Sequence, residues 1–372
     1  MNCKPSLLIV GAGIVGISSA LEALNKFDVY IVEKNHFIGE GASGRSSEVI
    51  HSGIYYKPGS HKAKFCVEGN RQVYNFCIEH NIQFQNTGKA IVAQNGEEIN
   101  TLNMLFERAY KNRIQNVRLV SGSTLQKGFT HLRKFVQEPN VCCEAALYIP
   151  STGIFDTATF VKKHAQLYEA RSGNLIGLNS EIEDIETENR IRVHIKNQGV
   201  IECDYLLNTT GVFADKIIKM FDSHWDNCIT PVVGQSMILN PNREDLKTTM
   251  PIYGIPRIWM VDEKETHTTG PHTTTTLDGR VTLGPVYRNA NHEEDYEVLS
   301  NKSNFLLPFF PSIKKDDLSL HHAGTQAKHP RNDFIIHWHN NNIVSAIGTD
   351  SPGLTASGPL GKEIAKQLEE RL

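Results

Sequence analysis

The chain has 372 residues, of which 40% are hydrophobic and 21% are charged. This composition is typical of a globular protein with a sizeable core, and the length suffices for two ordinary domains or one large domain with an insertion. The formal net charge is −3, which argues against a nucleic acid or another polyanion bound through bulk electrostatics.

The seven cysteines indicate free thiols. Their number is odd, no pair has CxxC spacing, and the adjacent Cys142 and Cys143 cannot easily bridge each other. We therefore expect a reducing, cytoplasmic location. The apolar run Leu7–Leu21 is interrupted by three glycines and is too short to span a bilayer, so we do not expect it to be a signal peptide or a membrane anchor.

The first motif is a strand, a glycine-rich turn, a helix and a second strand that ends in an acid. In chain order these parts are Ser6–Val10, Gly11–Gly16, Ile14–Asn25, Val29–Val32 and Glu33. In such a unit Gly11 permits the tight turn, Gly13 lets a pyrophosphate approach the backbone, and Gly16 lets the helix pack on the strand. A carboxylate at Glu33 accepts hydrogen bonds from ribose hydroxyls and disfavours a 2′-phosphate. The unit predicts a dinucleotide site and leaves FAD and NAD both open.

The stretch that follows is rich in small residues. Residues 41–47 read GASGRSS and include Arg45, so backbone, hydroxyl and guanidinium donors can meet phosphates or a ring edge there. An ordinary polar loop is the alternative interpretation of the same residues.

The sequence also resembles a known family. Residues 41–60, GASGRSSEVIHSGIYYKPGS, and residues 351–357, SPGLTAS, are similar to the L-2-hydroxyglutarate dehydrogenase/oxidase family. That family lies within the D-amino-acid-oxidase-like FAD-dependent oxidoreductases. Supporting matches occur at residues 148–156, 208–211 and 272–285, so the resemblance extends over the whole chain.

The resemblance implies an α/β fold, α+β overall. A Rossmann-like FAD-binding domain would be combined with a discontinuous substrate domain on a mixed or antiparallel sheet. We place the FAD-binding domain at residues 1–85, 151–215 and 321–372, and the substrate domain at residues 86–150 and 216–320. Further strands are expected at Gly88–Ala93, Val117–Val120, Val232–Leu239, Val281–Leu283 and Ile343–Ile347, and helices at Ser60–His80, Glu97–Asn112 and Thr355–Leu372.

Motifs and resemblance together imply the residues that contact FAD. They are Gly11, Gly13, Ile14, Val15, Gly16, Glu33, Lys34, Ala42, Ser43, Arg45, Ser46, Ser47, Gly211, Gly353, Leu354 and Thr355. The last three open the C-terminal helix, where the family places the flavin O2 carbonyl. Backbone donors and the helix dipole would hold the negative charge of the reduced flavin at that point.

The proton chemistry favours a histidine, whose pKa lies near neutrality. Among the 16 histidines we favour His51, which directly follows the second FAD block, over His272, which lies in a family motif on a strand. Tyr55 and Tyr56 are expected to line the substrate pocket. The pair His321-His322 lacks convergent Cys, Asp or Glu spacing, so we interpret it as structural and predict no metal site.

One position departs from the family pattern. Related enzymes usually carry an arginine in a Gly-x-Arg-Pro motif after the inserted domain, and that guanidinium binds the substrate carboxylate. The corresponding run here is His322–Lys328, with Gln326 in the arginine position. We assign Gln326 and Lys328 to substrate binding, with Arg331, Arg257 and Arg280 as alternative cations.

The leading hypothesis is hydride transfer from a small 2-hydroxy acid to flavin N5, with L-2-hydroxyglutarate, oxidised to 2-oxoglutarate, as the first candidate. An amine or amino-acid oxidase on the same fold is the second hypothesis. A flavin-binding scaffold protein with little catalysis is the third, and an NAD-only dehydrogenase a weaker fourth. The expected partner is a small carboxylate, without nucleic acid or a transmembrane segment. The electron acceptor (oxygen, quinone or another protein) and a peripheral association with membranes stay open.

Overall fold

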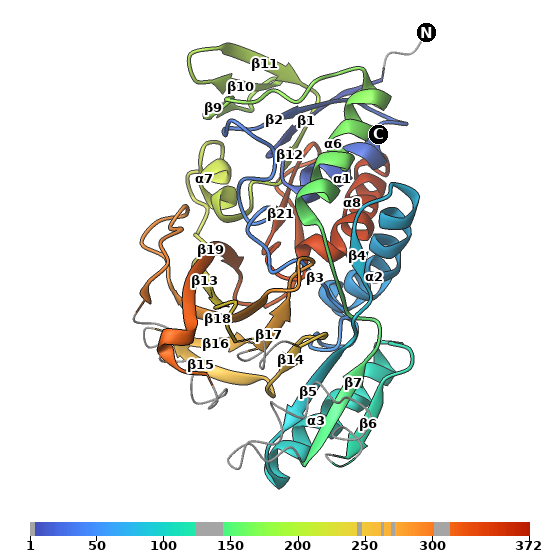
Figure 1. Cartoon of the computed structure of the whole chain (residues 1–372). Coiled ribbons are helices and arrows are strands. Elements are labelled where there is room, and N and C mark those ends of the chain that lie inside the picture. The colour runs from blue at the N-terminus through green and yellow to red at the C-terminus, as the bar shows by residue number, and fades with distance from the viewer. Residues whose placement is uncertain are drawn as a thin grey trace. The chain divides into compact units, whose positions relative to one another are not determined.

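The computed structural model describes residues 4–121, 123, 144–243, 248–261, 264–268, 272–300 and 313–372. The chain divides into two compact units (Figure 1). Unit 1 comprises residues 1–46, 157–231 and 325–372, and unit 2 comprises residues 47–156 and 232–324. Within the described ranges, no helix combines the length and the apolar character needed to cross a membrane.

Unit 1 is built on a five-stranded sheet in the order β2-β1-β12-β21-β20. The strands are β1 (Ser6–Val10), β2 (Asp28–Val32), β12 (Tyr205–Asn208), β20 (Ile335–Trp338) and β21 (Ile343–Ile347). β2, β1, β12 and β21 run parallel, and β20 is antiparallel to β21. Parallel strands end at the same edge of a sheet. Gly11, Glu33, Thr209 and Gly348, which follow the four parallel strands, therefore lie along one edge.

Three helices of unit 1 lie side by side in Figure 1. They are α1 (Ile14–Ala23), α6 (Thr157–Ser172) and α8 (Gly353–Glu369). α1 and α8 cross closely, because a Cβ atom on Gly361 would lie 2.8 Å from the backbone of both Ser18 and Ser19. Glycine at this position lets the two helices approach each other.

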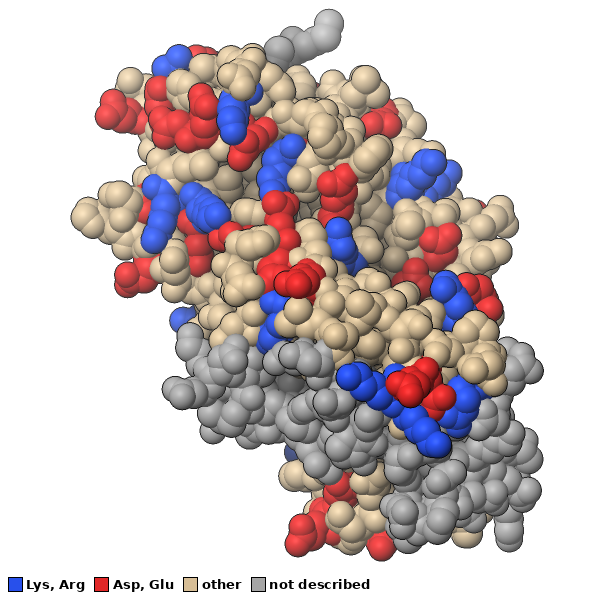
Figure 2. Space-filling model, turned by 60° about the vertical axis from the view of Figure 1, so that its left-hand side comes forward, with Lys and Arg blue, Asp and Glu red and all other residues tan. Residues whose placement is uncertain are grey.

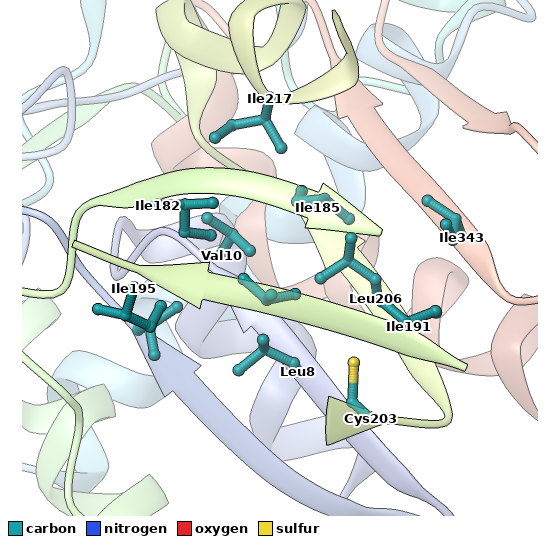
Figure 3. Close-up of a cluster of buried hydrophobic side chains, with 12 residues drawn as sticks. Leu8, Val10, Ile182, Ile185, Ile191, Ile195, Cys203, Leu206, Ile217 and Ile343 are labelled. Atoms are coloured by element: carbon teal, nitrogen blue, oxygen red, sulfur yellow. The ribbon is translucent and has the colours of Figure 1, made fainter. Parts of the chain in front are cut away.

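A small antiparallel sheet completes the core of unit 1. It contains β9 (Ile182–Glu186), β10 (Ile191–Ile195) and β11 (Gly199–Cys203). Figure 3 shows its inward side chains, such as Ile185 and Ile195, in one cluster with Leu8 and Val10 of β1 and Ile217 of α7 (Ala214–Lys219). A short 3-10 turn, Gly211–Phe213, precedes α7. The apolar cluster anchors the sheet that carries the glycine-rich turn.

Unit 2 contains most of an eight-stranded sheet in the order β19-β13-β18-β17-β14-β5-β7-β6, and only residues 230–231 of β13 and 325–328 of β19 are assigned to unit 1. Its strands are β5 (Lys89–Ala93), β6 (Arg118–Ser121), β7 (Ala145–Ile149), β13 (Thr230–Leu239), β14 (Ile252–Tyr253), β17 (His272–Thr275), β18 (Val281–Asn289) and β19 (Leu318–Lys328). β5 and β14 run parallel, whereas the β5–β7, β6–β7, β14–β17, β17–β18 and β13–β18 pairs are antiparallel.

Smaller elements surround this sheet. The helices are α2 (His61–Glu79) and α3 (Gly96–Lys111), and a 3-10 turn spans Lys315–Asp317. Two further sheets contain β3 (Val49–Ile50), β8 (Gly153–Phe155) and β4 (Phe84–Gln85), and β15 (Arg257–Val261) with β16 (Lys264–Thr268). Charged side chains of both signs are interspersed over the described part of the face in Figure 2.

Alternation along β5 gives its two faces different neighbours. Ala90 and Val92 join an apolar cluster with residues of β13 and β18. Ile91 and Ala93 point to the other face, where α3 covers β5 and β7 (Figure 1). Successive side chains of a strand alternate between faces, so Lys89 shares the α3 face with Ile91.

The α/β class is confirmed. The two compact units comprise three and two segments of the chain. The boundaries differ from the predicted ones. The first segment of unit 1 ends at residue 46, whereas we predicted 85. Its second segment spans residues 157–231, compared with the predicted 151–215. Its third segment begins at residue 325, compared with the predicted 321. The first difference is the largest because α2, an N-terminal helix by position, packs within unit 2.

Candidate functional site

The glycine-rich turn of unit 1 has a geometry that side chains would obstruct. Gly11 has φ +104°, and a Cβ atom there would lie 3.0 Å from the carbonyl oxygen of Thr209. A Cβ atom on Gly16 would lie 2.2 Å from the carbonyl oxygen of Gly11 and 2.6 Å from Thr209 Oγ1. These short distances explain why glycine is needed at both positions. Without side chains there, a ligand can come close to the backbone where β1 joins α1.

Glu33 lies at the end of β2, partly buried. Its Oε2 accepts a hydrogen bond from the backbone N–H of Ala12 (2.8 Å), and its Oε1 accepts one from the N–H of Asn35 (3.0 Å). The carboxylate is therefore fixed beside the glycine-rich turn. Lys34, the next residue, holds its ammonium 3.9 Å from the centre of the Phe213 ring.

The small-residue stretch reaches the same edge of the sheet. Ser43 Oγ accepts a hydrogen bond from the N–H of Ile14 (3.1 Å), the first residue of α1. A Cβ atom on Gly13 would lie 3.3 Å from that same hydroxyl oxygen. Arg45 Nε donates to the carbonyl oxygen of Glu40 (3.2 Å). Ser43 thus lies at the start of α1, and the interpretation of residues 41–46 as a plain surface loop is disfavoured.

An ion pair joins the end of β19 to the loop before α8. Lys328 Nζ donates to Asp350 (2.6 Å), whose side chain is almost fully buried. The carbonyl oxygen of Asp350 accepts a hydrogen bond from the N–H of Gly353, the first residue of α8. The pair therefore fixes the loop from which Gly353, Leu354 and Thr355 begin the helix.

In unit 2, residues 51–56 form a loop that two helices hold; we call it the His51 loop. From α2, Asn70 Nδ2 donates to the carbonyl oxygen of His51 (2.9 Å). From α3, Arg108 donates to the carbonyl oxygen of Tyr55 (2.9 Å), and Asn112, which follows α3, donates to that of Tyr56 (3.0 Å). These bonds satisfy carbonyl groups that no strand partner takes up, so the loop has a defined conformation.

The central strands of unit 2 bring aromatic and cationic side chains to the same face. Tyr253 and His272 are opposite each other in the β14–β17 register, and their rings stack at 3.9 Å between centroids. Lys89 Nζ lies 4.3 Å from the centre of the Tyr55 ring and 4.4 Å from that of Tyr253. We call His51, Tyr55, Lys89, Tyr253 and His272 the lysine cluster.

Burial is the main cause of the pKa shifts in the lysine cluster. It lowers the pKa of Lys89 to about 7, while the nearby Cys66 thiol opposes that shift. Burial, followed by the charges of Lys89 and His272, holds the pKa of His51 well below its usual range. Burial raises the pKa of both Tyr55 and Tyr253. Near neutral pH His51 is therefore a neutral imidazole beside an amine that changes charge there.

Comparison with known proteins identifies the family. The model of the FAD-dependent oxidoreductase family (DAO) matches residues 6–367. The chain belongs to this family. Its resemblance to L-2-hydroxyglutarate dehydrogenases is confirmed by a protein of that name from Indibacter alkaliphilus, 32% identical over 78% of this chain and 70% of its own length.

Two further comparisons define how far this likeness extends. The Escherichia coli (strain K12) L-2-hydroxyglutarate dehydrogenase is 29% identical over 75% of this chain, and the match spans only 63% of its length. The solved structure of L-alpha-glycerophosphate oxidase from Mycoplasma pneumoniae with FAD bound has a TM-score of 0.83 at 24% identity and covers 98% of this chain and 95% of its own. At that identity the structure supports the fold alone, which is the Rossmann-like fold we expected.

FAD is the cofactor of this oxidoreductase family, and the geometry of unit 1 fits it. The glycine backbone at the start of α1 can approach a pyrophosphate, and the N-terminal end of the helix favours negative charge. Glu33 is held beside the glycine-rich turn, and a carboxylate at the end of the second strand can accept hydrogen bonds from a ribose. The N-terminus of α8 offers the same kind of environment to the anionic part of the flavin. The residue-by-residue assignment of FAD contacts stays a prediction.

The expected site residues are distributed over the two units. All the expected FAD contacts except Ser47 lie in unit 1, as do Gln326 and Lys328, whereas Ser47, His51, Tyr55, Tyr56 and His272 lie in unit 2. The structure brings His51, Tyr55 and His272 together in the lysine cluster.

The alternative cations that we considered have other surroundings. Lys328 is paired with Asp350, Arg280 is paired with Asp278 (2.7 Å), and Arg331 is exposed. The side chain of Arg257 lies outside the described residues. His321 and His322 contact each other through their Nδ1 atoms (2.8 Å), and Ser236 Oγ lies within hydrogen-bond distance of both.

Sequence reasoning did not find Lys89. Its only signal was a lysine at the start of an otherwise apolar strand, in the run GKAIVA. A charged residue in a strand that is buried throughout needs a counter-charge or a function.

Proposed function

We propose that this FAD-dependent oxidoreductase oxidises a small 2-hydroxy acid to the 2-oxo acid, with L-2-hydroxyglutarate as the first substrate to test. The relatives named above support this substrate class. The matches cover only 63% to 70% of the length of these relatives. The substrate is therefore a proposal for this chain.

The observation that carries the proposal is the convergence of His51, Lys89 and His272 in the lysine cluster. Oxidation of the alcohol removes a hydride from the carbon and a proton from the hydroxyl group. Bound FAD supplies the acceptor for the hydride. His51 is a neutral imidazole at neutral pH, so it has the protonation state needed to accept the hydroxyl proton, and we assign that role to it. His272, stacked on Tyr253, would position the cluster.

The charges of the cluster favour a hydroxy acid over an amine. An amino-acid substrate arrives with an ammonium group, which needs an acidic partner. Among the described residues, no carboxylate is a cause of the pKa shifts of His51 or Lys89. A hydroxy acid brings only negative charge to this cationic environment, and its binding is therefore favoured.

The test is an anaerobic titration of the purified FAD-containing protein. We expect L-2-hydroxyglutarate to bleach the visible flavin absorbance and to yield one equivalent of 2-oxoglutarate. Parallel samples receive D-2-hydroxyglutarate, L-lactate, L-proline and glycine. Bleaching by the amino acids and not by the hydroxy acids would establish the amine-oxidase alternative. A flavin that none of these compounds reduces would favour the scaffold alternative.

A further inference from the structure

Lys89 has surroundings that are unusual for an ammonium group. Its side chain is fully buried, with 0% of its surface exposed. Nζ lies 4.3 Å from the centre of the Tyr55 ring and 4.4 Å from that of the Tyr253 ring and makes no hydrogen bond to any described residue. The ring faces attract a cation, but they accept none of the three strong hydrogen bonds that an ammonium can donate.

The rest of the strand shows that an apolar side chain would suit this position. Ile91 and Ala93, on the same face of β5, pack in the apolar cluster beneath α3. Burying a cation without a counter-charge is among the costliest arrangements in a protein. A lysine at this place therefore indicates a ligand that supplies negative charge.

The neighbouring groups define the chemistry of that ligand. The hydroxyl group of Tyr55 is also buried and has no hydrogen-bond partner among the described residues. An ammonium beside a residue with an unpartnered hydroxyl donor suits an oxygen anion, and a metal ion would be repelled. The anionic group of the ligand should be small, because Lys89 belongs to β5 and its ammonium is covered by Tyr55 of the His51 loop.

We propose that the Lys89 ammonium is the counter-charge for the carboxylate next to the reacting carbon of the substrate. This inference rests on the proposed function, since it concerns the same 2-hydroxy acid. The hydroxyl and the carboxylate of such an acid are attached to adjacent carbons. The base and the cation that serve them must therefore be neighbours, as His51 and Lys89 are.

The proposal predicts how binding depends on pH. The titratable groups around Lys89 are His51 and Tyr55 of the His51 loop, Cys66 of α2, Tyr253 of β14 and His272 of β17. The pKa of His51 lies well below neutrality, and burial raises the pKa of Cys66 and of both tyrosines. Between pH 6 and 9 the titration of Lys89 is therefore expected to determine how carboxylate binding depends on pH. Carboxylate affinity should fall about tenfold per pH unit above the Lys89 pKa of about 7.

The test measures binding of 2-oxoglutarate to the FAD-containing protein, by calorimetry and by the change in the flavin spectrum. Lys89→Met removes the charge at similar volume, Lys89→Arg keeps a charge that does not titrate, and Lys57→Met removes an exposed lysine just after the His51 loop. We expect Lys89→Met to weaken binding roughly 30-fold or more at pH 6.5 and to abolish its pH dependence, and Lys57→Met to change little. Lys89→Arg should bind without the decrease between pH 7 and 9.

Retained FAD and a melting temperature no lower than that of the wild type serve as the check on folding. Wild-type affinity and pH dependence in Lys89→Met would overturn the inference. If L-2-hydroxyglutarate reduces the wild type and Lys89→Met equally well, the proposed function stands and the role of Lys89 falls. If L-2-hydroxyglutarate has no effect but L-lactate or L-glycerol 3-phosphate binds in a Lys89-dependent manner, the anion site stands and the proposed substrate falls.

Discussion

At the scale of single residues, the buried lysine has a measurable cost. Unfolding returns the Lys89 pKa from about 7 to its ordinary value of 10.5, so between these values the unfolded chain binds one more proton than the folded one. Stability then rises with pH by about 1.4 kcal/mol per unit. The loss of folding stability caused by the buried Lys89 charge is fully present below pH 7 and amounts to roughly 5 kcal/mol. It disappears as the pH rises to 10.5.

We therefore expect Lys89→Met to be more stable than the wild type by a few kcal/mol at pH 7, and the gain to shrink as the pH rises to 9. Urea unfolding of the FAD-containing protein, in buffers free of carboxylates, measures the difference. A gain that is constant from pH 7 to 9 would mean that the Lys89 pKa is not lowered. Lys57→Met, which removes an exposed charge, is the matched control.

His51 carries the second prediction at this scale. His51→Asn should lower the rate of flavin reduction by L-2-hydroxyglutarate by about 10²- to 10⁴-fold, while the protein still retains FAD. Because the pKa of His51 is held well below its usual range, the wild-type rate should not decline between pH 7 and 5. Stopped-flow measurements test both statements, with the exposed His292→Asn as control. A rate within tenfold of the wild type would point to another proton acceptor, His272 first.

At the scale of elements, the junction between β1 and α1 depends on Gly16. A methyl group there would approach the Gly11 carbonyl and Thr209 Oγ1 at 2.2 and 2.6 Å, so the turn would have to open. We expect Gly16→Ala to lose FAD during purification, although alanine by itself favours a helix by about 1 kcal/mol over glycine. Bound FAD per protein is the measurement. Gly96→Ala, at a helical glycine with open space around it, should keep its FAD; equal retention in both variants would contradict the steric argument.

The elements also show which parts of the site can be predicted from sequence. The motif Ser6–Glu33 is predictable because its strand, turn, helix and acid are consecutive, and each has a local pattern. The lysine cluster is not predictable in this way. Its members come from a loop and three strands, and β14, which carries Tyr253, has only two residues, too few for a periodic pattern. Lys89 points to a functional site only because it is buried. Its burial depends on the place of β5 within the sheet, which the sequence alone does not reveal.

At the scale of the whole molecule, the cofactor edge of unit 1 combines three segments that are distant in sequence. The glycine-rich turn, the end of β12 and the start of α8 follow strands that are neighbours in one sheet. FAD should therefore slow amide hydrogen exchange in residues 8–18, 207–214 and 348–358 together. Mass spectrometry of the protein with and without FAD measures this, and peptides of β9–β11 serve as the unaffected control. Protection confined to the first segment would show that the three do not form one site.

The domain boundaries could not be predicted for a related reason. The sequence around residue 85 shows a helix followed by a strand, which suits either unit. Hydrogen bonds from Asn70 and Arg108 to the His51 loop help to hold α2 and α3 in unit 2. Such bonds join residues that are far apart in the chain, and a single sequence does not reveal them.

The pairing of β1 with β12 also bears on how the protein is synthesised. Val10 lies beside Asn208, and Leu206 lies beside Ile343, so the apolar first strand leaves the ribosome long before its partner. At typical elongation rates of 5–20 residues per second, it waits roughly 10 to 40 s for β12, and longer for β21. During that time its free edge can pair with other chains. The nascent chain is therefore most dependent on chaperones before residue 208 is made, and the FAD site is complete only after the final helix has begun to emerge.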